Sequence, residues 1–143
     1  MSKLERTIFD SYRDLYRPYV NAMNNRLVKY QLYTSQWGIL RLIMLRETCT
    51  LAELAKESRV EKPSVTRIIQ KLMELGYVEV NQGDDKREKY VRLTQKGIDV
   101  TTSIKKEIST YINGLTEGID ERELETTRKV LDQVLQKILE KES

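Results

Sequence analysis

Short polar and cationic side chains gather in the middle of the chain, in a stretch that from Lys62 onward contains no acid before Glu74. Arginine and glutamine can donate hydrogen bonds to base edges in the major groove of DNA, and serine, threonine and lysine commonly contact its phosphates. We therefore expect Arg67 or Gln70 to read bases, the alternative being the ordinary polar face of a core helix. The predicted DNA contacts of this stretch are Lys62, Pro63, Ser64, Thr66, Arg67, Gln70 and Lys71.

A second group of charged residues follows around Arg87. Two runs rich in β-branched and aromatic residues, 77–81 and 89–93, flank the turn-forming residues 82–85 and predict an antiparallel hairpin. The negative potential of a DNA minor groove favours a guanidinium, and we expect Asp85 to hold Arg87 extended toward it. The predicted DNA contacts of the hairpin are Lys86, Arg87 and Lys89. The alternative is a solvated turn whose charges only prevent pairing at the strand edge.

A helix and a hairpin must position these side chains, and the sequence predicts both. Pro63 fits the first turn of a helix, where its missing amide costs nothing, and Gly76 suits the left-handed residue that ends one. Apolar residues at helical spacing predict the buried face of this helix. They are Val65, Ile68, Ile69, Leu72 and Met73. With a short helix around residues 51–55 before it, the order predicts a winged helix-turn-helix.

Long helices are expected on both sides of this central part. Apolar residues at helical spacing predict one helix over about residues 3–30 and a second that Thr34 or Ser35 caps. Thr94 is expected to cap a fifth helix and Asp120 a sixth. The predicted fold is mainly α with a small β-hairpin: a winged helix-turn-helix domain plus a helical dimerisation region.

The apolar stripes of the first, fifth and last helices predict a homodimer, because one small winged domain cannot cover them. The expected division is an N-terminal dimerisation helix at 1–33, a winged domain at 34–96 and C-terminal dimerisation helices at 97–143. Two-fold symmetry then places the two DNA-reading helices about 34 Å apart, one turn of DNA. The predicted dimer contacts are Leu4, Ile8, Ile112, Leu115, Leu131, Leu135 and Ile138.

The composition narrows the class of protein. The net charge is only +3, but residues 59–96 carry nine basic and six acidic side chains, so the excess lies where DNA contacts are predicted. With no histidine and one cysteine, the chain lacks ligands for a structural zinc site and cannot form a nucleophile-histidine triad. We expect no metal, no cofactor and no enzymatic activity.

Without a secretion signal or an apolar run of about eighteen residues, a cytoplasmic protein with no membrane contact is expected.

Several motifs together resemble the multiple antibiotic resistance regulator (MarR) family. They are Leu54-Ala55, Ser64-Val65-Thr66-Arg67, the run from Leu72 to Val78, Asp85-Lys86-Arg87 and the run from Val91 to Gly97. The resemblance covers nearly the whole chain, and it implies an obligate homodimer that binds a roughly palindromic double-stranded DNA operator, usually as a repressor. It also implies that Asp85 and Arg87 are the paired wing residues of the family, with Lys86 where an arginine is often found.

The resemblance further implies regulation by a small phenolic or other amphipathic ligand. The ligand would bind in a cleft between the dimerisation helices and the DNA-binding lobe. The residues that would line this cleft are Tyr12, Tyr16, Tyr19, Met23, Tyr30, Trp37 and Arg41. Aromatic residues at this spacing are also typical of a plain helical core.

Two other interpretations stay open. A winged-helix adaptor that binds protein instead of DNA is expected to carry acids or large apolar groups on the outer face of the fourth helix, where Arg67 and Lys71 are found. A thiol-based redox regulator would have to use Cys49, although some relatives sense oxidants through a cysteine near the start of the first helix, a segment that has none here. Only Arg46 is a candidate cation beside Cys49, so a buried or idle thiol is the interpretation we prefer.

Overall fold

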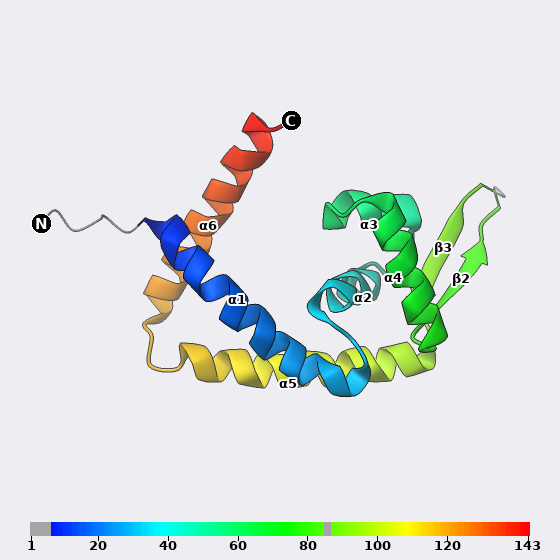
Figure 1. The fold of residues 1–143 in the computed structure, drawn as a ribbon, viewed down its shortest axis with the longest axis horizontal. Helices are drawn as coiled ribbons and strands as arrows, with labels where there is room; N and C mark the ends of the chain where they lie inside the picture. Colours follow the sequence, from blue (N-terminus) through cyan, green and yellow to red (C-terminus); the bar gives the residue numbers. More distant parts are fainter. Residues whose placement is uncertain (1–6, 85–86) are drawn as a thin grey trace, which may run out of the picture. The chain divides into compact units, whose positions relative to one another are not determined.

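The computed structural model describes residues 7–84 and 87–143 and is mainly helical with a three-stranded antiparallel sheet (Figure 1), which confirms the predicted fold class. The elements are α1 (Ile8–Leu27), η1 (Val28–Tyr30), α2 (Thr34–Arg46), β1 (Thr48–Thr50), α3 (Leu51–Ser58), α4 (Lys62–Glu74), β2 (Val78–Gln82), β3 (Lys89–Leu93), α5 (Gln95–Thr116) and α6 (Glu121–Lys141). The chain divides into two compact units, the first ending at Ile108 and the second beginning at Ser109, within α5.

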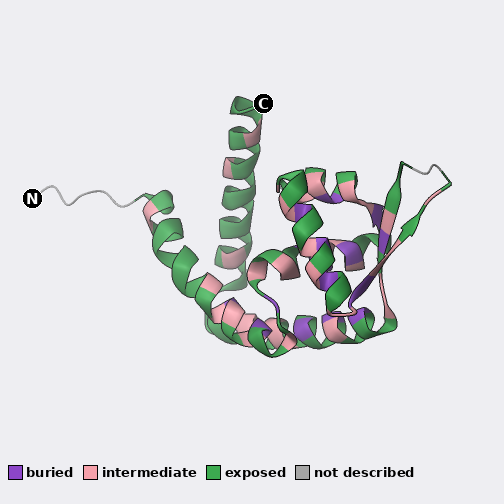
Figure 2. Cartoon of the chain, turned by 45° about the vertical axis from the view of Figure 1, so that its right-hand side comes forward, coloured by how far each residue is buried: buried purple, intermediate pink, exposed green. Residues whose placement is uncertain are grey.

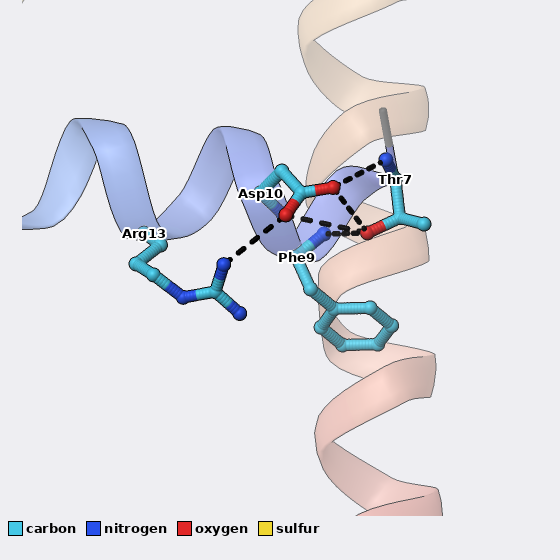
Figure 3. A network of polar contacts seen from close by, with 4 residues as sticks. All are labelled: Thr7, Phe9, Asp10 and Arg13. Carbon is cyan, nitrogen blue, oxygen red and sulfur yellow. Dashed lines mark hydrogen bonds and ion pairs between the residues drawn. The ribbon is translucent and has the colours of Figure 1, made fainter. Parts of the chain in front are cut away.

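Thr7 and Asp10 determine where α1 begins (Figure 3). The Thr7 hydroxyl accepts hydrogen bonds from the amides of Phe9 and Asp10, while the Asp10 carboxylate accepts one from the Thr7 amide at 2.9 Å and pairs with Arg13 at 3.1 Å. The bond from the Thr7 amide is the main reason why the pKa of Asp10 lies below its usual range. This capping box starts the helix at Ile8, so the predicted start near residue 3 was wrong.

The connection between α1 and α2 also differs from the prediction. Residues 28–30 form a 3₁₀ turn that ends at Gln31, whose φ is 62°. The N-cap of α2 is Tyr33, and its amide donates to the Gln36 side chain at 3.0 Å. The predicted cap at Thr34 or Ser35 was wrong, because both residues are already inside the helix; the Thr34 amide donates instead to the Asn24 side chain of α1 at 2.9 Å.

The sheet has the strand order β1-β3-β2. The predicted hairpin is present, with Val78 opposite Leu93 and Gln82 opposite Lys89. Strand β1 was not predicted: it pairs with the other edge of β3, and Cys49 lies opposite Val91. A three-residue strand has too few positions for an alternating pattern to be recognised, and its partner is distant in the sequence.

The core of the first unit lies where α2, α3, α4 and the sheet face one another (Figure 2). Helix α2 contacts α1, α3, α4, β1 and β3, so it lies at the centre of this unit. The least exposed large side chains of this core include Leu40, Ile43, Leu54, Val65, Leu72, Val91 and Ile104. Ile104 belongs to α5, as do the buried residues Gly97 and Thr101, so the first half of that helix is packed into the first unit.

Candidate nucleic-acid interface

Helix α4 buries one face and exposes the predicted contact residues on the other. Pro63 lies in its first turn, and Val65, Ile69 and Leu72 are buried on its inner side. The outward positions are Lys62, Pro63, Thr66, Arg67 and Gln70, which are exposed, and Ser64 and Lys71, which are half-buried. Met73 was predicted to be buried and is 46% exposed, because it lies at the edge of the apolar stripe and no other element covers it fully.

Two of the polar residues on α4 already have partners within the helix. The Arg67 guanidinium donates to the Ser64 hydroxyl at 3.1 Å, so Ser64 helps to orient the predicted base-reading residue. The Thr66 hydroxyl donates to the Lys62 carbonyl at 3.0 Å, which uses its proton inside the helix and leaves oxygen lone pairs and the methyl group outward. Thr66 can therefore contact DNA chiefly as an acceptor or through its methyl group.

The end of α4 is bound tightly to the start of α5. Gly76 has a φ of 78°, and the amides of Gly76 and Tyr77 donate to the carbonyls of Met73 and Leu72, both at 2.9 Å, in a Schellman motif. The Tyr77 carbonyl accepts from the Thr94 amide at 3.0 Å, and the Thr94 hydroxyl accepts from the Gly97 amide at 3.0 Å. The predicted helix end at Gly76 and cap at Thr94 are both confirmed.

The hairpin, or wing, is held near its turn by contacts that the sequence did not predict. The Gly83 amide donates to the Glu88 carbonyl at 3.0 Å, and the Tyr90 hydroxyl donates to the Glu88 carboxylate at 2.7 Å. A Cβ on Gly83 would lie 2.2 Å from the Tyr90 ring, so any other residue here would require the ring to move. The turn-forming pattern indicated a glycine here, but its pairing with Tyr90 had no signal in the sequence.

The predicted contacts of the wing are only partly described. Arg87 and Lys89 are exposed, whereas Asp85 and Lys86 lie outside the described residues, so the expected support of Arg87 by Asp85 stays a prediction. A third cation, Arg92, forms an ion pair with Glu79 directly opposite on β2. That ion pair reduces the charge that Arg92 offers to a phosphate.

The predicted ligand residues are spread over α1, η1 and α2. Tyr12, Tyr16 and Tyr19 are exposed on α1, and the Tyr12 and Tyr16 ring centroids are 5.9 Å apart. Met23 is buried, Tyr30 and Trp37 are half-buried, and Arg41 is exposed. A separate open pocket of about 360 Å³ contains none of them. Its lining residues are Ile43, Met44, Glu47, Arg92, Leu93, Ile98, Thr101 and Thr102.

Cys49 is buried in the sheet and 2% exposed. Burial raises the pKa of its thiol to about 11, and nearby Glu53 adds to this effect while Arg46 opposes it. Because the thiolate is the form that reacts with oxidants, the environment of Cys49 does not favour redox sensing.

Most of the predicted dimer contacts that the structure describes are exposed. Ile8 and Leu115 are exposed and Ile112 is half-buried, while Leu4 lies outside the described residues. On α6, Leu131, Leu135 and Ile138 are between 44% and 49% exposed, and Figure 2 shows this helix without a buried position.

Metal and membrane sites were searched for in residues 7–84 and 87–143. No group of three or more cysteine or carboxylate side chains there is placed to hold a metal ion. The helices in that part of the chain all lack the length and apolar character needed to cross a membrane.

A helix, a turn, an outward-facing second helix and a hairpin define a winged helix-turn-helix protein. The MarR family model matches residues 30–88. An uncharacterized HTH-type transcriptional regulator of Staphylococcus aureus (strain MSSA476) is 30% identical over 143 residues, 98% of this chain and 97% of the relative. The chain therefore belongs to the MarR family of helix-turn-helix transcriptional regulators.

Two further comparisons agree with this assignment. The uncharacterized HTH-type transcriptional regulator YwoH of Bacillus subtilis (strain 168) is 36% identical over 96 residues, 67% of this chain and 70% of the relative. The solved structure of Staphylococcus aureus MarR in complex with salicylate and kanamycin has a TM-score of 0.85 and 27% sequence identity, covering 93% of this chain and 91% of that one.

Proposed function

We propose that this protein is a homodimeric repressor that binds a palindromic operator and is released from it by a small amphipathic or phenolic ligand. The observation that carries the proposal is the outer face of α4, where Arg67 and Gln70 are exposed, together with the exposed wing residues Arg87 and Lys89. In the proposed complex, α4 enters the major groove as the recognition helix, and Arg87 of the wing reaches the minor groove. Lys62, Lys71 and Lys89 contact phosphates.

The dimer is supported by the exposed apolar residues of α1 and α6. A second copy of the chain would remove side chains such as Leu135 and Ile138 from water. This burial stabilises the dimer by about 25 cal/mol per Å² of apolar surface. A two-fold dimer presents two copies of α4 related by symmetry, which matches a palindromic site.

Release by a ligand is supported by the salicylate complex of the Staphylococcus aureus relative and by the aromatic surface of α1. The exposed rings of Tyr12 and Tyr16 offer apolar contacts to a phenolic compound, and Arg41 offers a cation for a carboxylate. A ligand weakens operator binding only if it prefers a dimer arrangement that differs from the DNA-bound one.

Neither alternative has equal support. An adaptor that binds protein is expected to carry acids or large apolar groups on the outer face of α4, where Arg67 and Gln70 are exposed instead. A redox regulator needs a reactive thiol, and Cys49 is buried with a raised thiol pKa.

The experiment is selection of duplexes from a random pool by the full chain, followed by mobility shifts at increasing salt. We expect enriched sequences with two-fold symmetry. We also expect the affinity to fall about a thousandfold or more between about 50 and 200 mM salt, because lysine and arginine side chains that bind phosphates release counterions from the DNA. Salicylate added to the operator complex is expected to release DNA. An unenriched pool together with salt-insensitive binding would refute operator recognition, and operator binding unchanged by salicylate and similar phenols would refute the ligand.

A further inference from the structure

Tyr77 is buried at the point where the recognition helix ends, and it contacts three separate parts of the first unit. It is 4% exposed and immediately follows the left-handed Gly76. Its hydroxyl donates to the Tyr30 carbonyl at 2.7 Å, although the two residues are 47 positions apart in the sequence. Its own carbonyl accepts from the Thr94 amide at 3.0 Å.

The start of α5 is packed directly against Tyr77. A Cβ on Gly97 would lie 1.9 Å from the Tyr77 carbonyl oxygen, so the two backbones touch with no room for a side chain. The ammonium group of Lys96 lies 5.5 Å from the centre of the Tyr77 ring. Tyr77 is therefore held at the first turn of α5 by its backbone, by its ring and by the Thr94 hydrogen bond.

The Tyr30 side of this contact is itself anchored to α5. The Tyr30 hydroxyl donates to the Glu107 carboxylate at 3.2 Å, and Lys29 forms an ion pair with the same carboxylate at 2.8 Å. The hydrogen bond from Lys29 is the main reason why the pKa of Glu107 is lowered, so this carboxylate is charged at neutral pH. The segment that leaves α1 is thus connected to both α5 and Tyr77.

We propose that Tyr77 is a positioning residue for operator recognition, whose hydroxyl fixes the end of α4 to the α1–α2 connection and so determines the spacing of the two recognition helices. The inference rests on the proposed function, because it needs a dimer that reads two half-sites. The recognition helix is joined through Tyr77 to η1 after α1 and to the start of α5. The dimer contacts are predicted on α1 and α5. Loss of the Tyr77 hydrogen bond would therefore let α4 move relative to the α4 of the second subunit.

The test compares Tyr77→Phe with the wild type on duplexes whose half-sites are kept, moved apart by one base pair or moved together by one. The variant keeps the ring and every backbone contact and loses one hydroxyl. We expect affinity for the unaltered operator to fall about three- to tenfold, as for loss of one hydrogen bond. We also expect a smaller penalty for altered spacing than the wild type has, and unchanged binding to a random duplex.

Tyr33→Phe is the matched control, since it removes a hydroxyl from a tyrosine that is 61% exposed. It is expected to bind like the wild type on every duplex. Unchanged spacing discrimination in Tyr77→Phe would overturn the inference while leaving operator recognition intact. A wild type that selects no operator would instead remove the proposed function itself.

Tyr30→Phe gives an independent test, and it decides the matter if Tyr77→Phe unfolds. It frees the Tyr30 side chain from Glu107 and loosens the same connection from the other side. We expect it to reduce spacing discrimination, and the double variant to lose less than the sum of the two single losses, because both act through one segment. Normal spacing discrimination in Tyr30→Phe, or fully additive losses, would count against the inference.

Discussion

At the outer face of α4, the type of each side chain and its local partner decide what it can do. Arg67 keeps free donors after its hydrogen bond to Ser64, whereas the Thr66 proton is bound to the helix backbone. Arginine offers up to five donors in a planar arrangement that suits two acceptors on one guanine. Arg67 is therefore the strongest candidate for reading a base.

Replacing Arg67 by alanine should separate base reading from phosphate binding. Arg67→Ala is expected to cost about 1 to 3 kcal/mol of operator binding and to relax sequence preference at one base pair, whereas Lys89→Ala should weaken all duplexes alike and lower the salt slope by about one. Titrations of operator and random duplexes at several salt concentrations measure both effects. Equal losses on the two duplexes for both variants would contradict the assigned roles.

At the scale of elements, the junction of α4 and α5 depends on backbone contact more than on side-chain size. Gly97 is buried in the first turn of α5 and lies against the Tyr77 carbonyl. Two residues in the run from Val91 to Gly97 thus have a physical explanation: Thr94 caps α5, and Gly97 lets this helix approach the end of α4.

Gly97→Ala should destabilise the fold even though alanine is the better helix former. The new methyl group would lie 1.9 Å from a backbone oxygen, so the junction must open, at a cost of about 1 to 3 kcal/mol. Gly38→Ala in α2 is the control, because its Cβ meets nothing within 4 Å, and it should stabilise by about 0.5 to 1 kcal/mol. Urea denaturation measures the free energy of unfolding of both variants. A Gly97→Ala variant as stable as the wild type would show that the ends of α4 and α5 can move apart at little cost.

At the scale of the whole molecule, the exposed apolar residues of α1 and α6 form surfaces that burial against another protein chain would stabilise. The side chains at Leu131, Leu135 and Ile138 recur at helical spacing and are each nearly half exposed. Soluble monomers rarely leave such contiguous stripes open, and a second copy is the partner that the predicted two-fold symmetry supplies.

Leu135→Asp should abolish the dimer and, with it, binding to a two-half-site operator. A carboxylate would have to be desolvated in an apolar seam, which costs several kcal/mol. Gln133→Asp introduces the same charge on the opposite face of α6 and should leave the dimer intact. Light scattering measures both masses, and a dimeric Leu135→Asp protein would show that this part of α6 is not the seam.

The sequence alone determined the elements whose causes are local. Pro63 and Gly76 predicted the bounds of α4, Thr94 predicted the start of α5, and helical periodicity predicted that Arg67 faces outward. Each of these depends on backbone preference or spacing within a few residues, so it can be recognised without the rest of the fold.

Only the tertiary structure decided the contacts between distant segments. It pairs β1 with β3, brings the Tyr77 hydroxyl to the Tyr30 carbonyl, makes Tyr33 the N-cap of α2 and leaves Met73 partly exposed. Such contacts depend on how whole helices pack, because a hydrogen bond between remote residues leaves no periodic pattern in either segment. For the same reason, the outward-facing positions of α4 were predictable, whereas the contacts of Tyr77 that hold the end of this helix were not.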